Sequence, residues 1–78
     1  MKNLESLRKQ IDEIDESIVT LLTKRMEVVK KVGQYKKENN IQVFDKKRLE
    51  KILDSKKGFM KKIWKIIHDE SLEIEEKI

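Results

Sequence analysis

The sequence contains no cysteine and no proline, and it has only two glycines, Gly33 and Gly58, among 78 residues. Without cysteine the chain forms no disulfide and no thiolate metal site, and a single histidine argues against a zinc site. Few helix breakers and turn residues argue against a β-rich fold. No apolar run is long enough to span a membrane, and the first residues lack an apolar signal region. We therefore expect an all-helical cytoplasmic protein.

Aromatic and apolar residues are also scarce, at 5% and 37% of the chain, whereas charged residues make up 44%. The 19 basic and 15 acidic residues leave a net charge of only +4, which indicates a mixed, solvated surface. A chain of this length makes a single domain, residues 1–78, with a thin core that often needs a partner.

One long helical pattern dominates the first half of the chain. Apolar residues recur at spacings of three and four from Leu4 to Tyr35, with Asn3 as the N-cap and Asn39 and Asn40 as the stop. A helix over residues 4–38 would be about 52 Å long, at ~1.5 Å per residue. A compact monomer of this size has a radius of gyration of only ~11–12 Å. The stripe therefore predicts a dimer in which two long helices pack together.

The second half predicts two further helices. Residues 41–44 form an extended connector, and Asp45 is the N-cap of a helix of about ten residues. Residues 54–58 are the turn-like cluster, after which Phe59 or Met60 begins a helix whose apolar residues continue to Ile78. The expected fold is all-α, with a long, a short and a medium helix.

Two cations lie on one face of the long helix. Arg25 and Lys36 are 11 residues apart, which places them within about 20° of each other and about 16 Å apart along the axis. Val29 and Val32 lie between them, so the face suits a small anionic ligand. The alternative is a pair of solvated cations whose stems cover apolar surface.

Arg8 precedes Arg25 by about 25 Å along the same helix and cannot reach a small site there. In an antiparallel helix pair it would face the middle or end of the partner helix, and so it could complete the partner's site. The alternative is a surface pair with Asp12, four residues later.

Other polar residues form candidate pairs. Asp45 and Arg48 lie at the start of the second helix, and Ser71 and Glu75 share a face of the third. The alternative for Asp45 and Arg48 is ordinary helix capping. The alternative for Ser71 and Glu75 is a solvated helix face in an acidic tail. We interpret His68 as a bystander.

Four motifs taken together resemble the all-α chorismate mutases, which are intertwined helical homodimers of phenylalanine and tyrosine biosynthesis. They are LRKQIDEID at 7–15, LLTKR at 21–25, VGQYK at 32–36 and DKKR at 45–48. The resemblance implies an isomerase that converts chorismate to prephenate by an intramolecular Claisen rearrangement. It implies no metal and no cofactor.

The resemblance also implies roles for residues. Arg8 of the partner, Arg25 and Arg48 would bind the carboxylates of chorismate, and Lys36 would contact a carboxylate and the ether oxygen.

On the ring side, the backbone near Asp45, together with Ser71, would hold the substrate, and Glu75 would face the ether oxygen. A shift of helix three by one residue would instead place Glu70 and Ile74 there. We prefer Ser71 and Glu75 because they keep a polar pair together.

Leu49 departs from the family pattern, which usually has a glutamate there to accept a hydrogen bond from the ring hydroxyl. This keeps open two alternatives, an isochorismate-pyruvate lyase of the same fold and a non-catalytic helical dimer module.

The basic and aromatic run at 56–65 suggests nucleic-acid or membrane contact, but we interpret it as a turn and a solvated helix face. We expect no nucleic-acid or membrane partner.

Overall fold

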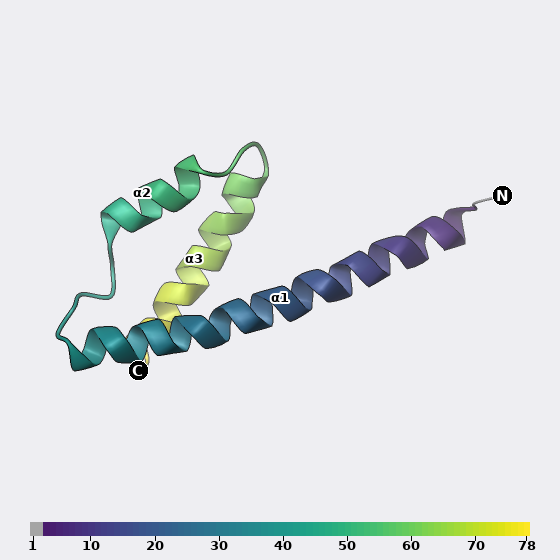
Figure 1. Ribbon diagram of the computed structural model, residues 1–78. Coiled ribbons are helices and arrows are strands. Elements are labelled where there is room, and N and C mark those ends of the chain that lie inside the picture. The colour runs from purple at the N-terminus through teal and green to yellow at the C-terminus, as the bar shows by residue number, and fades with distance from the viewer. Residues whose placement is uncertain (1–2) are drawn as a thin grey trace.

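The computed structural model describes residues 3–78, which form three α-helices and no strand. They are α1 (Leu4–Glu38), α2 (Lys46–Asp54) and α3 (Met60–Glu76), and Figure 1 shows them in a triangular arrangement. The predicted all-α class and the long, short, medium order are confirmed. Within these residues, no helix is long and apolar enough to cross a membrane.

Helix α1 begins and ends at the predicted residues because both ends are capped locally. The side chain of Asn3 accepts a hydrogen bond from the Ser6 backbone N–H at 2.9 Å. Asn39 closes the other end, and Asn40 follows with a φ of 55°, in the left-handed region that asparagine tolerates. These short-range contacts explain why the boundaries could be predicted.

The later helices follow from similar local signals. The Asp45 side chain caps α2 by accepting from the Arg48 N–H at 3.1 Å. The turn contains Gly58 at a φ of 58°, which other residues rarely adopt. Helix α3 begins at Met60 without a side-chain cap from Phe59. Lys56 lies 4.5 Å from the Trp64 ring centroid, so part of the basic and aromatic run interacts with itself.

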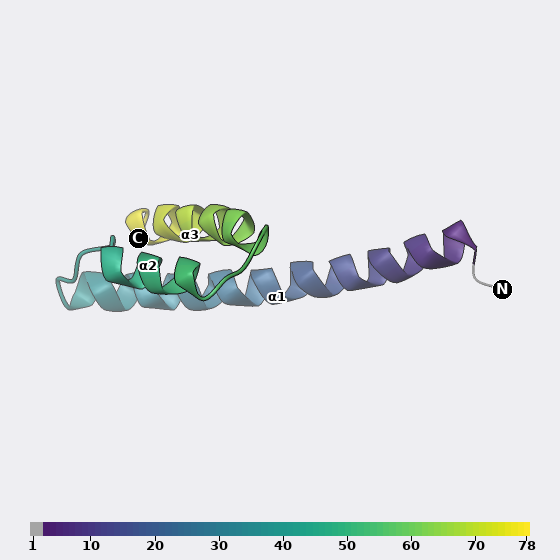
Figure 2. The same ribbon diagram turned by 90° about the horizontal axis from the view of Figure 1, so that it is seen from above.

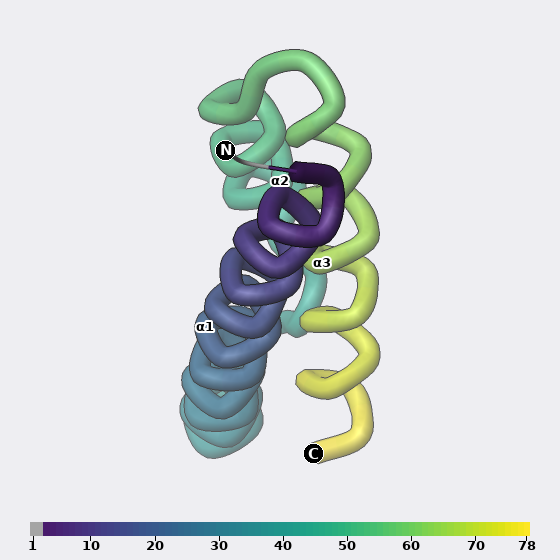
Figure 3. Tube along the Cα trace, turned by 90° about the vertical axis from the view of Figure 1, so that its right-hand side faces the viewer, coloured from purple at the N-terminus to yellow at the C-terminus, as the bar shows by residue number. Residues whose placement is uncertain are grey.

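Helix α3 packs against the C-terminal half of α1, whereas α2 packs against α3 and does not contact α1. Helix α3 contacts α1 and α2, and it crosses α1 near the C-terminal end of that helix (Figures 1 and 2). A view along α1 shows α3 running beside it (Figure 3). The core between them is small, and the buried apolar side chains among the described residues are Val29 and Ile67.

The N-terminal half of α1 projects beyond the other helices (Figure 1). The chain measures 58 × 24 × 14 Å and has a radius of gyration of 16.4 Å, far above the ~11–12 Å of a compact chain of this size. The apolar stripe on this half is open to solvent, with exposed fractions between 46% and 60% at Leu4, Leu7, Ile11, Ile14 and Ile18. No other part of the chain between residues 3 and 78 covers it.

Candidate active site

A cavity of about 130 Å³ lies where the three helices converge. Helix α1 contributes Arg25, Val29, Val32 and Lys36. Val43 and Asp45 line it from the connector, and Arg48 and Ile52 from α2. Helix α3 adds His68, Leu72 and Glu75. The apolar floor and the two cations predicted on one face of α1 therefore line a single cavity.

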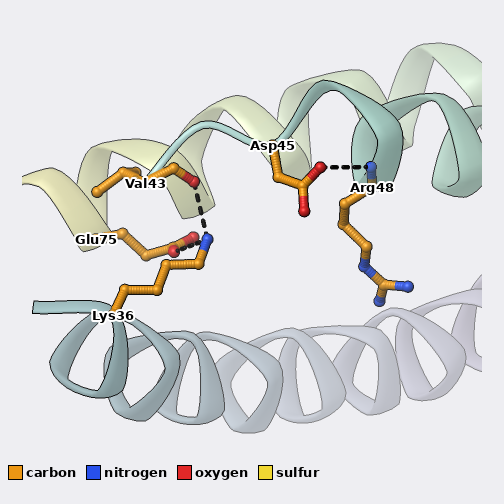
Figure 4. A network of polar contacts seen from close by, with 5 residues as sticks. All are labelled: Lys36, Val43, Asp45, Arg48 and Glu75. Carbon is orange, nitrogen blue, oxygen red and sulfur yellow. Dashed lines mark hydrogen bonds and ion pairs between the residues drawn. The ribbon is translucent and has the colours of Figure 1, made fainter. Parts of the chain in front are cut away.

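Lys36 and Glu75 form an ion pair inside the cavity (Figure 4). Lys36 Nζ lies 2.7 Å from Glu75 Oε1 and donates a hydrogen bond to the Val43 carbonyl at 2.8 Å. The two side chains are only 18% and 8% exposed, so solvent screens their charges weakly. The Lys36 ammonium and the Glu75 carboxylate are in direct contact, but Glu75 Oε1 does not meet the angular criteria of a hydrogen bond. The pair therefore holds the ammonium in place by charge and through Val43.

Gly33 permits this pairing because α3 crosses α1 there. A Cβ atom at residue 33 would lie 2.7 Å from Ile78 Cδ1 and 3.1 Å from Glu75 Cα. The Ile78 side chain can rotate away, but the Glu75 backbone can move only with α3. Gly33 therefore sets the distance between Lys36 and Glu75.

We expect Gly33→Ala to lower the free energy of unfolding by about 1–2 kcal/mol, because overpacking typically costs ~1–3 kcal/mol and the higher helix propensity of alanine offsets part of it. Activity should also fall, since Glu75 would be displaced from Lys36. Urea unfolding and steady-state kinetics would measure both, with Gln34→Ala at the exposed neighbouring position as the control. A more stable and equally active Gly33→Ala variant would contradict the close approach.

Arg25 is held by Ser71 across the α1–α3 contact. Arg25 Nη1 donates to Ser71 Oγ at 2.6 Å, and that hydroxyl donates to the Ile67 carbonyl at 2.7 Å. Ser71 is 4% exposed, so the alternative of a solvated face does not hold for this residue. Burial and then the Arg48 cation lower the pKa of Arg25, while Glu75 opposes them. Arginine keeps its charge despite such a shift.

Asp45 and Arg48 stand at the rim, and both are exposed. The Asp45 carboxylate caps α2 through the Arg48 backbone N–H, so it fixes the first turn of that helix. Figure 4 shows the Arg48 guanidinium extending from α2 toward α1. Within residues 3–78 it has no acidic partner, so it is available to an anion in the cavity.

His68, interpreted from the sequence as a bystander, lines the same cavity. It is 7% exposed, and its Nε2 is buried without a hydrogen-bond partner among the described residues. Such an unpaired group typically costs ~1–3 kcal/mol. His68 precedes Ser71 by three residues and Glu75 by seven, so the helical spacing was the signal that could have found it.

Four other positions considered from the sequence do not line the cavity: Arg8, Leu49, Glu70 and Ile74. Arg8 is exposed on the N-terminal half of α1, 17 residues before Arg25 and about 25 Å from it along the helix axis. Leu49 is half-buried but does not line the cavity. Glu70 is exposed and Ile74 lies on a different surface, whereas Ser71 and Glu75 face α1.

The cavity is suited to a small ligand with more than one negative charge. Three cations line it, and its acids are the paired Glu75 and the capping Asp45. Guanidinium groups bind carboxylates in bidentate fashion, and a lysine ammonium can follow a charge that moves. The described residues contain no cluster of histidine and acidic side chains that could hold a metal ion.

Comparison with known proteins agrees with this geometry. The chain is 37% identical over 54 residues to a bifunctional chorismate mutase/prephenate dehydratase of Aquifex aeolicus, and this match covers 69% of the chain but 15% of that enzyme. A conserved hypothetical protein from Pyrococcus furiosus has a similar structure, with a TM-score of 0.90 and 37% identity over 96% of this chain and 97% of its own. The family model for chorismate mutase type II matches residues 7–76. The chain therefore belongs to the chorismate mutase type II family.

Proposed function

We propose that the protein catalyses the rearrangement of chorismate to prephenate, the isomerase step of phenylalanine and tyrosine biosynthesis. The observation that carries the proposal is the convergence of Arg25, Lys36 and Arg48 on one cavity. Membership in the family and the name of the Aquifex relative support it.

Substrate binding would rely on the two arginines. Chorismate is a flexible dianion that reacts only when its enolpyruvyl arm folds over the ring. Bidentate contacts from Arg25 and Arg48 to its carboxylates would hold that conformer, and a fixed near-attack geometry lowers the entropic part of the barrier. Ser71 keeps Arg25 oriented, and Asp45 keeps the first turn of α2 in place.

Lys36 would supply the electrostatic part of catalysis. As the ether C–O bond breaks and the new C–C bond forms within one molecule, negative charge grows on the ether oxygen. An ammonium beside that oxygen stabilises the transition state more than the ground state. In the free protein Lys36 is paired with Glu75, so the substrate must share this ammonium while Val43 holds it.

A second copy of the chain would complete each site. The exposed apolar stripe of α1 is the surface such a copy would cover. In an antiparallel pair of α1 helices, Arg8 of one protomer would approach Arg25 of its partner. We propose an intertwined homodimer with one site at each end and Arg8 contributed across the interface.

The proposal is tested by the spectrophotometric loss of chorismate, measured beside the sedimentation mass. A dimer that forms prephenate is the expected result. A dimer that does not consume chorismate would favour a non-catalytic helical module, and a monomer would contradict the shared site.

Leu49 favours one alternative reaction, because helix α2 offers no carboxylate to a ring hydroxyl at that position. An isochorismate-pyruvate lyase of the same fold would release salicylate and pyruvate from isochorismate. Incubation with each substrate separates the two enzymes by their products.

Glu75 gives a further prediction. Its carboxylate would compete with the substrate for Lys36 and repel the negative charge that grows on the ether oxygen. The side-chain amide in Glu75→Gln carries no charge and can donate a hydrogen bond to that oxygen, so we expect this variant to keep at least the wild-type kcat. Steady-state kinetics with chorismate would measure kcat, and a large loss in a folded variant would contradict this role of Glu75.

A further inference from the structure

His68 is the buried polar residue of the cavity that the proposed mechanism leaves without a role. It is 7% exposed, lines the cavity and lies on the face of α3 that carries Ser71 and Glu75. Its Nε2 has no hydrogen-bond partner within residues 3–78. Buried polar groups of native proteins normally have partners, so this nitrogen indicates a contact that the chain does not supply by itself.

The other polar groups of the cavity already have partners or carry charge. Lys36 pairs with Glu75 and Val43, and the Asp45 carboxylate caps α2. Arg25 and Arg48 are cations suited to carboxylates. The imidazole is therefore the uncommitted group that can bind an uncharged polar atom.

The charge state of His68 agrees with this role. Burial lowers its pKa below 6.5, and the Arg25 cation of α1 and Lys65 of α3 act in the same direction. Asp69 and Glu75, both on α3, oppose them. The lowered pKa favours the neutral imidazole, which both accepts and donates hydrogen bonds.

We propose that His68 Nε2 forms a hydrogen bond with the ring hydroxyl of the substrate and thereby selects hydroxylated cyclohexadiene dicarboxylates. This inference rests on the proposed function. Chorismate offers two carboxylates to the cations, an ether oxygen to Lys36 and one neutral hydroxyl. Leu49 lines no part of the cavity, so the contact would come from α3 in place of α2.

The test compares chorismate with its analogue that lacks the ring hydroxyl. In His68→Leu, kcat/KM for chorismate should fall about 10–100-fold, mostly through a higher KM. The kcat/KM for the analogue should stay unchanged, because the analogue has no hydroxyl that could bond to His68. His68→Gln, which retains hydrogen-bonding groups, should recover part of the loss. Glu73→Gln, at an exposed position of α3 that is not among the groups acting on His68, is the matched control. Circular dichroism and sedimentation mass show whether each variant is folded.

Equal losses with both compounds would overturn the inference, because they indicate a structural role for His68. A loss of hydroxyl preference in Asp45→Asn but not in His68→Leu would assign the contact to Asp45. If the wild-type protein does not turn over chorismate, the proposed function fails. Calorimetry with unreactive bicyclic dicarboxylates, with and without the hydroxyl, then still tests His68. A preference for the hydroxylated compound that disappears in His68→Leu supports the inference, and a preference that persists overturns it.

Discussion

Replacing Lys36 by alanine is expected to lower kcat by about 10²–10³-fold, which corresponds to the loss of one preorganised donor of ~3–4 kcal/mol. Lys36 Nζ is held between Glu75 and the Val43 carbonyl, so it is fixed before the substrate arrives. KM should change less than kcat, because the ammonium acts mainly on the charge that develops in the transition state. Steady-state kinetics with chorismate would measure both values.

The same substitution has a cost in stability that must be separated from catalysis. Glu75 is 8% exposed and would lose its ion-pair partner, and the breaking of a buried pair typically costs ~3–5 kcal/mol. The double variant Lys36→Ala/Glu75→Gln avoids a buried unpaired carboxylate and should regain stability without regaining activity.

Lys31→Ala is the matched control for Lys36, because it removes an exposed lysine on another face of α1. It should leave kcat unchanged. A folded Lys36 variant with nearly wild-type kcat would show that the ammonium does not stabilise the transition state.

Mixing two inactive variants should restore activity. Arg8→Ala and Arg25→Ala are each expected to lose most of their activity, because each removes a cation that binds a substrate carboxylate. In a symmetric dimer with a shared site, a heterodimer of the two has one site with both arginines. Half of the dimers in an equal mixture are heterodimers, so activity should recover to about a quarter of the wild-type value after random exchange of protomers.

The controls for this experiment follow from the position of Arg8 on the projecting half of α1. Lys9→Ala, at the exposed neighbouring position, should be active by itself. Exchange is verified by mass spectrometry of protomers labelled with heavy isotope. Heterodimers without recovered activity, or a fully active Arg8→Ala variant, would contradict the contribution of Arg8 across the interface.

The order and boundaries of the helices could be predicted because their causes are local. Asn3 and Asp45 cap helices through bonds to residues three positions later, and the apolar spacing of α1 needs no contact with another element to be recognised. The spacing of Arg25 and Lys36 likewise placed both on one face of a helix. In the structure both cations line the same cavity.

The partners of these cations depend on contacts between distant residues. Arg25 bonds to a hydroxyl 46 residues away, and Lys36 meets Glu75 because α3 crosses α1 at Gly33. Helical spacing placed Ser71 and Glu75 on one face of α3 but could not say whether that face meets solvent or α1. This explains why the solvated face stayed open as an alternative.

The sequence by itself determined three helices, a cationic face on the first of them and an apolar stripe too long for one compact chain, because these features repeat within a few residues. Only the tertiary structure decided that His68 is buried in the cavity and that Leu49 lies outside it. The physical reason is that burial depends on the angle and distance at which α3 packs against α1 and α2. That packing is set by contacts such as the close approach at Gly33, which no local pattern encodes.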